Sequence, residues 1–147
     1  MTMSWVGKKN GCQPSGVGKG PFKGKGEAIL LWHRESQDRL AQIHRDMAAL
    51  RDETKAVPDR QFSVDLHCLR HRDAKSLRWR MNSGAHMTWP RIVLLLARLP
   101  PSMVQWYWEV QARLLVINGQ EQVARYEVKT AQRLIEDMRS LLQRESV

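Results

Sequence analysis

Histidine and cysteine residues gather in the middle of the chain, where they could in principle bind a metal ion. His67, Cys68 and His71 are zinc-ligand types, and Cys12 could join them. Consecutive residues of a strand point to opposite faces, so His67 and Cys68 would not reach one ion without a bulge. No second CxxC or HxxxH pair completes a ligand set. We therefore expect no metal and no other cofactor, with Cys68 in the core and His67 exposed.

A glycine and lysine string, Gly16 to Gly20, invites comparison with the phosphate-binding loop of nucleotide-binding proteins. That loop needs a glycine at position 13, where this chain has Gln13, and a serine or threonine after Lys19, where it has Gly20. No apolar strand precedes the string either. The segment is typical of a basic arm that touches phosphates without sequence preference, or of a tail with no binding role.

The run from His67 to His71 is similar to the HxLRH box of tyrosine recombinases. The run from Pro101 to Tyr107 looks like the segment that carries their tyrosine nucleophile. Arg98, however, stands where that family has a second histidine or tryptophan, and the alternation around the box opposes a helix. The chain before His67 is also too short for the rest of such a catalytic domain. We expect no enzyme, with Tyr107 on a buried helical seam.

The last third of the chain carries an apolar stripe whose steps alternate between three and four residues. Such steps keep one seam facing a partner along a helix, so they predict a long helix paired with another. Only Glu121 breaks the stripe. Its members are Tyr107, Val110, Leu114, Ile117, Glu121, Ala124, Val128, Ala131, Ile135, Met138 and Leu142.

A first helix is expected from about Glu27 to Lys55, because it must end before Pro58. We predict that it pairs with the last helix in an antiparallel, coiled-coil-like manner. A stripe of this length could equally close between two chains, so a homodimer is left open. The apolar face of this first helix consists of Ile29, Trp32, Leu40, Ile43, Met47 and Leu50.

Between these helices the apolar period changes to two, which predicts a β-hairpin at about 61–82. Phe62, Val64, Leu66 and Cys68 alternate with polar residues, as do Leu77, Trp79 and Met81, and a polar turn is expected at 72–75. A short helix should follow from Trp89 to Leu99 and stop at Pro100 and Pro101. Ser102 with Gln105 has the spacing of a capping box for the long final helix. The predicted fold class is mainly α with a small β-hairpin, in the order α-β-β-α-α.

Five aromatic residues cluster in the second half of the chain. Aromatic residues at helical and strand spacing usually fill a core, although rings beside arginines could also stack on single-stranded bases. Three consecutive rings cannot all face the same way on a helix, so one should be exposed to a partner. The five are Trp79, Trp89, Trp106, Tyr107 and Trp108.

The composition points to an anionic partner. The chain has 147 residues with a net charge of +9 and a pI near 10.2, and nucleic acid is the commonest anionic partner inside cells. Residues 1–26 hold five lysines, no acidic residue and seven of the nine glycines, so we expect a flexible basic arm followed by one helical domain at 27–147. The longest apolar run is too short to cross a membrane, and two distant cysteines favour a reducing cytoplasm.

Three segments in order carry a family resemblance: Pro21–Gly26 entering a helix, the strand Leu77–Arg80, and Ile117–Gln120 in the late helix. Together they resemble an uncharacterised family, a domain of unknown function, encoded on integrative conjugative elements and plasmids of proteobacteria. The resemblance covers most of the chain after residue 20. It implies a mobile-element setting and no particular activity.

We therefore expect a non-enzymatic accessory protein of a mobile genetic element that binds DNA or a DNA-processing complex. Backbone contacts are expected from five basic residues of the arm and the hairpin, namely Lys19, Lys23, Lys25, Arg78 and Arg80. The alternative is a protein-interaction module or an inhibitor of a host protein, in which the helical pair and an exposed aromatic residue recognise an acidic protein.

Overall fold

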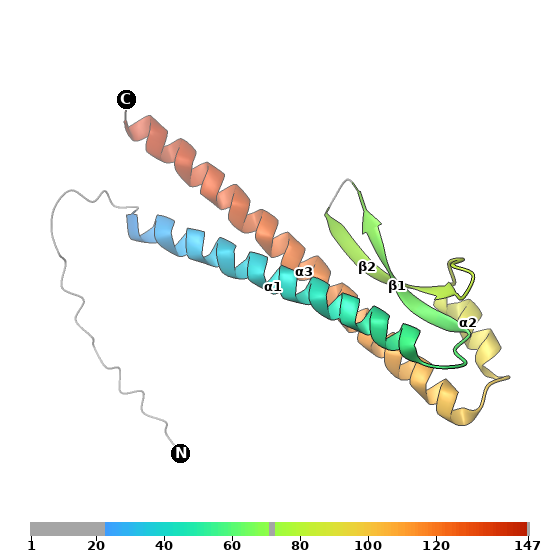
Figure 1. Cartoon of the computed structure of the whole chain (residues 1–147). Helices are drawn as coiled ribbons and strands as arrows, with labels where there is room; N and C mark the ends of the chain where they lie inside the picture. Colours follow the sequence, from blue (N-terminus) through green and yellow to red (C-terminus); the bar gives the residue numbers. More distant parts are fainter. Residues whose placement is uncertain (1–22, 71–72, 147) are drawn as a thin grey trace, which may run out of the picture.

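The computed structural model of the protein describes residues 23–70 and 73–146. Two long helices, α1 (Lys23–Ala56) and α3 (Pro101–Glu145), lie side by side (Figure 1). Between them in the sequence come strands β1 (Phe62–Leu69) and β2 (Ala74–Met81) and the short helix α2 (Trp89–Leu96). The hairpin and α2 sit together toward one end of the helix pair. The predicted fold class and the α-β-β-α-α order are confirmed.

Ion pairs show that α1 and α3 run antiparallel. Glu53 near the end of α1 pairs with Arg113 near the start of α3, and Arg39 pairs with Glu127 further along. The heptad stripe of α3 forms the seam between the helices: seven of its eleven members are buried, three are half-buried, and only its last residue is exposed. Because α1 of the same chain covers this seam, a homodimer would need a different surface.

Three predicted boundaries differ from the structure. Helix α1 begins at Lys23, so the last four residues assigned to the arm are helical, while residues 1–22 lie outside the described part of the chain. Helix α2 ends at Leu96. The capping box is wrong: Pro100 occupies the N-cap position of α3, and its carbonyl accepts hydrogen bonds from the N–H groups of Met103 and Val104 at 3.0 and 3.1 Å. Proline at the first helical position needs no N–H partner, so α3 can begin before Ser102.

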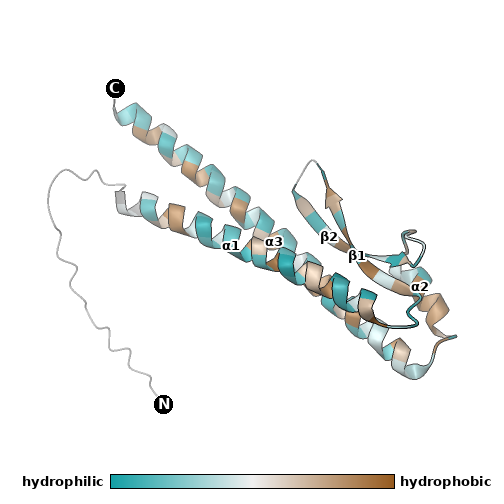
Figure 2. Ribbon diagram, viewed as in Figure 1, coloured by the Kyte–Doolittle hydropathy of each residue, from teal (hydrophilic) through white to brown (hydrophobic). Residues whose placement is uncertain are grey.

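The hairpin is antiparallel, and its register pairs Phe62 with Met81 and Leu69 with Ala74. Lys75 therefore lies within β2, and the turn falls one or two residues earlier than predicted. The inner face of the sheet packs against both long helices and α2 and forms the core. Figure 2 shows hydrophobic residues along α2, in the strands and at intervals on both long helices. The core side chains of the strands are Phe62, Val64, Leu77 and Trp79.

Polar side chains of α3 hold the outer edge of β2. The amide of Asn118 accepts from the N–H of Leu77 at 2.8 Å and donates to its C=O at 3.1 Å, as a neighbouring strand would. Gln111 accepts from the indole N–H of Trp79 at 2.8 Å. The two Asn118 bonds occupy backbone groups that an edge strand leaves unpaired, and together with the Gln111 bond they fix the hairpin on the helix.

Candidate nucleic-acid interface

Strand alternation divides the hairpin into an apolar face and a basic face. Leu77 and Trp79 point into the core, so Arg78 and Arg80 lie on the opposite, outer face of β2. The register places Asp65 directly across from Arg78. The two arginines predicted as phosphate contacts are thus brought together on one face, with the carboxylate of Asp65 beside them.

Asp65 neutralises part of this face. Burial raises the pKa of its carboxyl, but a 3.1 Å hydrogen bond from Lys55, a bond from the N–H of Leu66 and the charge of Arg80 outweigh it and hold the pKa below its ordinary value. The carboxylate is therefore ionised at neutral pH. The ion pair between Lys55 and Asp65 also connects the end of α1 to the hairpin.

Arg78 and Arg80 differ in their freedom to bind a ligand. Arg80 is half-buried and donates to the C=O of Gly84 at 2.9 Å, inside the tight turn that follows β2. Gly84 has a φ of 90°, a conformation that glycine adopts without strain. Arg78 is exposed, and its guanidinium has no hydrogen bond or ion pair to any described residue. Arg78 is thus the better placed of the two to meet a phosphate.

The other predicted contacts do not join this face. Lys19 lies outside the described residues, and nothing is described of the side chains of Lys23 and Lys25, which fall in the first turn of α1. From Lys25 to Lys55 the helix rises about 45 Å, at roughly 1.5 Å per residue. The start of α1 is therefore remote from Asp65 and Arg78, and the five predicted residues do not form one site.

Net positive charge is concentrated in one part of the fold. Between Arg60 and Arg98, which span the hairpin and α2, the sequence has eight basic and two acidic residues, a net charge of +6. The long helices α1 and α3 together have 13 basic and 12 acidic residues, a net charge of +1. Four arginines of the basic part are exposed and have no guanidinium partner among the described residues: Arg70, Arg78, Arg91 and Arg98.

A notch of about 330 Å³ lies between β2 and α3, beside this basic face. Lys75, Arg78 and Arg125 line it, together with the amides of Asn118 and Gln122. Arg125 is not free, because its Nε donates at 2.9 Å to the carboxylate of Glu121, which also lines the notch. Lys75 and Arg78 thus give the notch positive charge, whereas Arg125 and Glu121 neutralise each other.

Glu121, the residue that breaks the heptad stripe, is 1% exposed. It accepts from Arg125, lies 3.6 Å from Nε2 of His44 on α1, and accepts from the backbone N–H of Lys75 at 3.4 Å. A buried carboxylate requires such partners. This role of Glu121 and that of Asn118 were not predicted from the sequence. Gln111, Asn118 and Arg125 follow one another at intervals of seven, and this polar spacing beside the seam is the signal that could have revealed them.

Most of the aromatic cluster belongs to the core, as predicted. Trp79 and Tyr107 are 3% and 0% exposed, and the hydroxyl of Tyr107 accepts from the backbone N–H groups of Gln61 and Phe62 at 3.1 and 3.3 Å. Trp108 is the exposed ring that three consecutive aromatic residues require: it is 50% exposed and meets Trp89 edge to face at 5.0 Å. It lines an open groove of about 380 Å³ between α2 and α3.

Residues 23–70 and 73–146 contain no group of three or more His, Cys, Asp or Glu side chains that could hold a metal ion. The prediction that Cys68 is a core residue and His67 an exposed one is wrong, because Cys68 is exposed and His67 half-buried. Cys68 does alternate with the buried residues of β1, but it pairs with Lys75 near the tip of the hairpin. There the strands extend beyond the helices that cover their base (Figure 1).

Comparison of the chain with protein-family models, curated proteins and solved structures gave no match. The resemblance to a mobile-element family therefore stays a prediction. Within 23–70 and 73–146, none of the helices has both the length and the apolar character that crossing a membrane demands.

Proposed function

We propose that this protein binds nucleic acid through the sugar-phosphate backbone, with the hairpin and α2 as the contact surface. The observation that carries the proposal is the concentration of charge: +6 on residues 60–98 against +1 on the two long helices. A localised positive region, rather than a high overall charge, is the electrostatic footprint of a phosphate-binding protein.

The exposed arginines suit positioning contacts. A guanidinium can bind a phosphate with two parallel hydrogen bonds, and Arg78 has its full set of donors free. The end of β1 and the start of β2 extend away from the long helices (Figure 1), so an extended polyanion could lie along the strands without meeting the carboxylates of those helices. Contacts to phosphates carry no base information. We therefore expect little sequence preference.

In this proposal the chain is a non-enzymatic accessory protein that acts in the cytoplasm on DNA or a DNA-processing complex. The mobile-element setting comes from the family resemblance. Lys23 and Lys25 would supply at most a second, remote contact, since they begin α1 at its far end from the hairpin.

The experiment compares two variants that lose the same charge. One replaces the four exposed arginines of the hairpin and α2 by glutamine (R70Q/R78Q/R91Q/R98Q); the other replaces four exposed arginines of the long helices (R34Q/R133Q/R139Q/R144Q). Binding to a labelled random-sequence duplex is measured by fluorescence anisotropy at low salt. The first variant should lose at least tenfold in affinity and the second less than threefold. Equal losses would show that only overall charge matters and would overturn the assignment of the surface.

An alternative function rests on a separate observation, the exposure of Trp108 beside an apolar groove. A half-exposed tryptophan in a groove is a common anchor of protein interfaces. The protein would then be an interaction module or an inhibitor of a host protein. In that case Trp108→Ser abolishes capture of a specific partner and leaves DNA binding unchanged.

A further inference from the structure

Helix α3 has a second stripe of apolar and small residues that the heptad seam does not use. Its steps alternate between four and three from residue 112 to residue 130, and the stripe continues with Leu134 and Leu141. Its first six members are Ala112, Val116, Gly119, Val123, Tyr126 and Thr130. Large members are well exposed: Val116 is 60%, Val123 69% and Tyr126 68% accessible.

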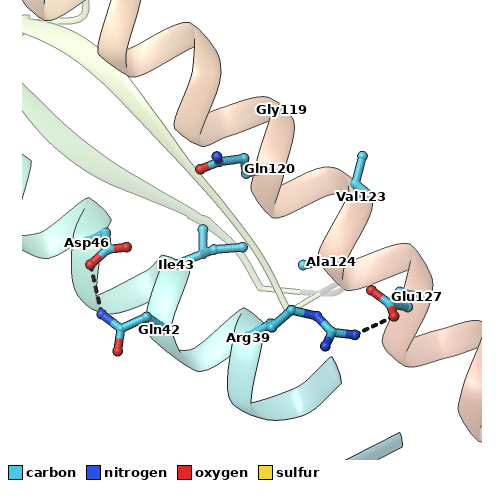
Figure 3. Close-up of a pocket in the computed structure, with 9 residues that line it drawn as sticks. All are labelled: Arg39, Gln42, Ile43, Asp46, Gly119, Gln120, Val123, Ala124 and Glu127. Carbon is cyan, nitrogen blue, oxygen red and sulfur yellow. Dashed lines mark hydrogen bonds and ion pairs between the residues drawn. The ribbon is translucent and has the colours of Figure 1, made fainter. Parts of the chain in front are cut away.

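The second stripe faces away from the hairpin. Asn118 and Glu121 hold β2, and Val116 and Val123 are each two residues from one of these, which is about 200° around a helix. The stripe borders a groove of about 670 Å³ between α1 and α3, where Ile43 and Ala124 lie between the helices and Val123 points outward (Figure 3). No other element in the described part of the chain covers this face.

The periodicity of the stripe indicates that the partner that binds it is a helix. Alternating steps of four and three keep a seam in register with another helix over many turns, which no strand or loop would require. Gly119 lies in the middle of the stripe, and a side-chain carbon built there would meet no atom within 4 Å. The open space at Gly119 allows the partner's side chains to approach the backbone closely.

The charged side chains that line the groove, Arg39, Asp46 and Glu127, have hydrogen-bond partners within the chain. Arg39 binds Glu127, Arg113 binds Glu53 through two hydrogen bonds, and Gln42 donates to Asp46. The six members of the stripe from Ala112 to Thr130 carry no charge, so the stripe itself offers nothing that would attract a strongly acidic or basic partner. An occupant that matches it is an uncharged apolar stripe of the same period and length.

We propose that this occupant is the same stripe of a second copy, so that two copies form a four-helix bundle with α3 against α3. The stripe from Ala112 to Leu141 is about 44 Å long, and the free face of two helices is about 20 Å wide. That area, on the order of 900 Å² per copy, is what a stable dimer buries. A helix with two apolar stripes is the usual element of a four-helix bundle, in which each helix contacts two neighbours. Both hairpins stay outside the interface.

Sedimentation velocity or light scattering of the full chain tests the proposal. Wild type at about 50 μM should have twice the monomer mass of 17.1 kDa. V116E/V123E should be monomeric with unchanged helicity, because two carboxylates would face each other across the interface. Leu94→Glu is the matched control: it adds one charge at a residue of α2 that is 78% exposed, and it should remain dimeric.

A wild-type protein that is monomeric at about 50 μM overturns the proposal, as does a V116E/V123E protein that stays dimeric. The milder variant Val123→Ser removes apolar area without adding charge and should weaken the dimer at least tenfold. It keeps the proposal testable if V116E/V123E fails to fold. DNA binding is a separate readout, since a monomeric variant keeps the whole basic hairpin.

Discussion

Asn118 is the side chain on which the position of the hairpin depends most. Asn118→Ala removes two hydrogen bonds, of 2.8 and 3.1 Å, and leaves both backbone groups of Leu77 without their partner. A typical bond contributes about 1 kcal/mol net, and an unsatisfied buried group costs about 1–3 kcal/mol. Leu77 and Asn118 both border the notch, so water can reach them and the lower range applies. We expect a loss of about 2 kcal/mol in the free energy of unfolding.

Urea denaturation followed by circular dichroism at one protein concentration measures this loss. With a typical slope of about 2 kcal/mol per molar urea, the midpoint should fall by about 1 M while the slope stays unchanged. Gln122→Ala is the control, because Gln122 is exposed on the same helix and donates no bond to the hairpin; it should change stability by less than about 0.5 kcal/mol. If both variants were equally stable, the edge of β2 would not depend on α3.

Three further predictions follow from individual contacts. Tyr107→Phe keeps the buried ring but removes the acceptor of two backbone N–H groups, so the free energy of unfolding should fall by about 1–2 kcal/mol in the same urea assay. The depressed pKa of Asp65 means that its ion pair stabilises the fold above its ordinary pKa of 3.8 and that this contribution is lost as the pH falls below that value; Asp65→Asn should flatten the acid limb of a stability-versus-pH curve, and an unchanged limb would count against the pair. In a Cys12→Ser background, the exposed thiol of Cys68 should react completely with Ellman's reagent without denaturant, whereas a slow reaction would place it in the core.

The elements of the fold could be predicted from the sequence because each has a strong period. Steps of three and four in α3 and alternation in β1 and β2 reflect burial of one face, and burial dominates stability. Element ends were less predictable. Pro100 and Pro101 allow α3 to start before Ser102, and Gly24 and Gly26 do not prevent α1 from starting at Lys23. Alternation alone also misplaced Cys68, because it cannot show where helices stop covering a strand.

The candidate site was only partly predictable. Arg78 and Arg80 share a face because alternation requires it, whereas the distance that separates them from Lys23 and Lys25 depends on how α1 packs. Glu121 was noticed as an interruption of the seam, and Arg125 follows it at i,i+4 spacing on the same helix, but its other partners, His44 and Lys75, come from α1 and β2. Such contacts between distant segments cannot be read from spacing along one helix.

The salt dependence of DNA binding tests most directly whether the hairpin and α2 bind phosphates. The affinity of wild type and of R70Q/R78Q/R91Q/R98Q for the same duplex is measured over a series of salt concentrations. Each phosphate contact contributes about 0.9 to the slope of log K against log salt, so loss of four contacts should reduce the slope by about 3 to 4. The helix variant R34Q/R133Q/R139Q/R144Q should keep the wild-type slope. Identical slopes for all three proteins, or no binding by wild type at low salt, would contradict the proposed function.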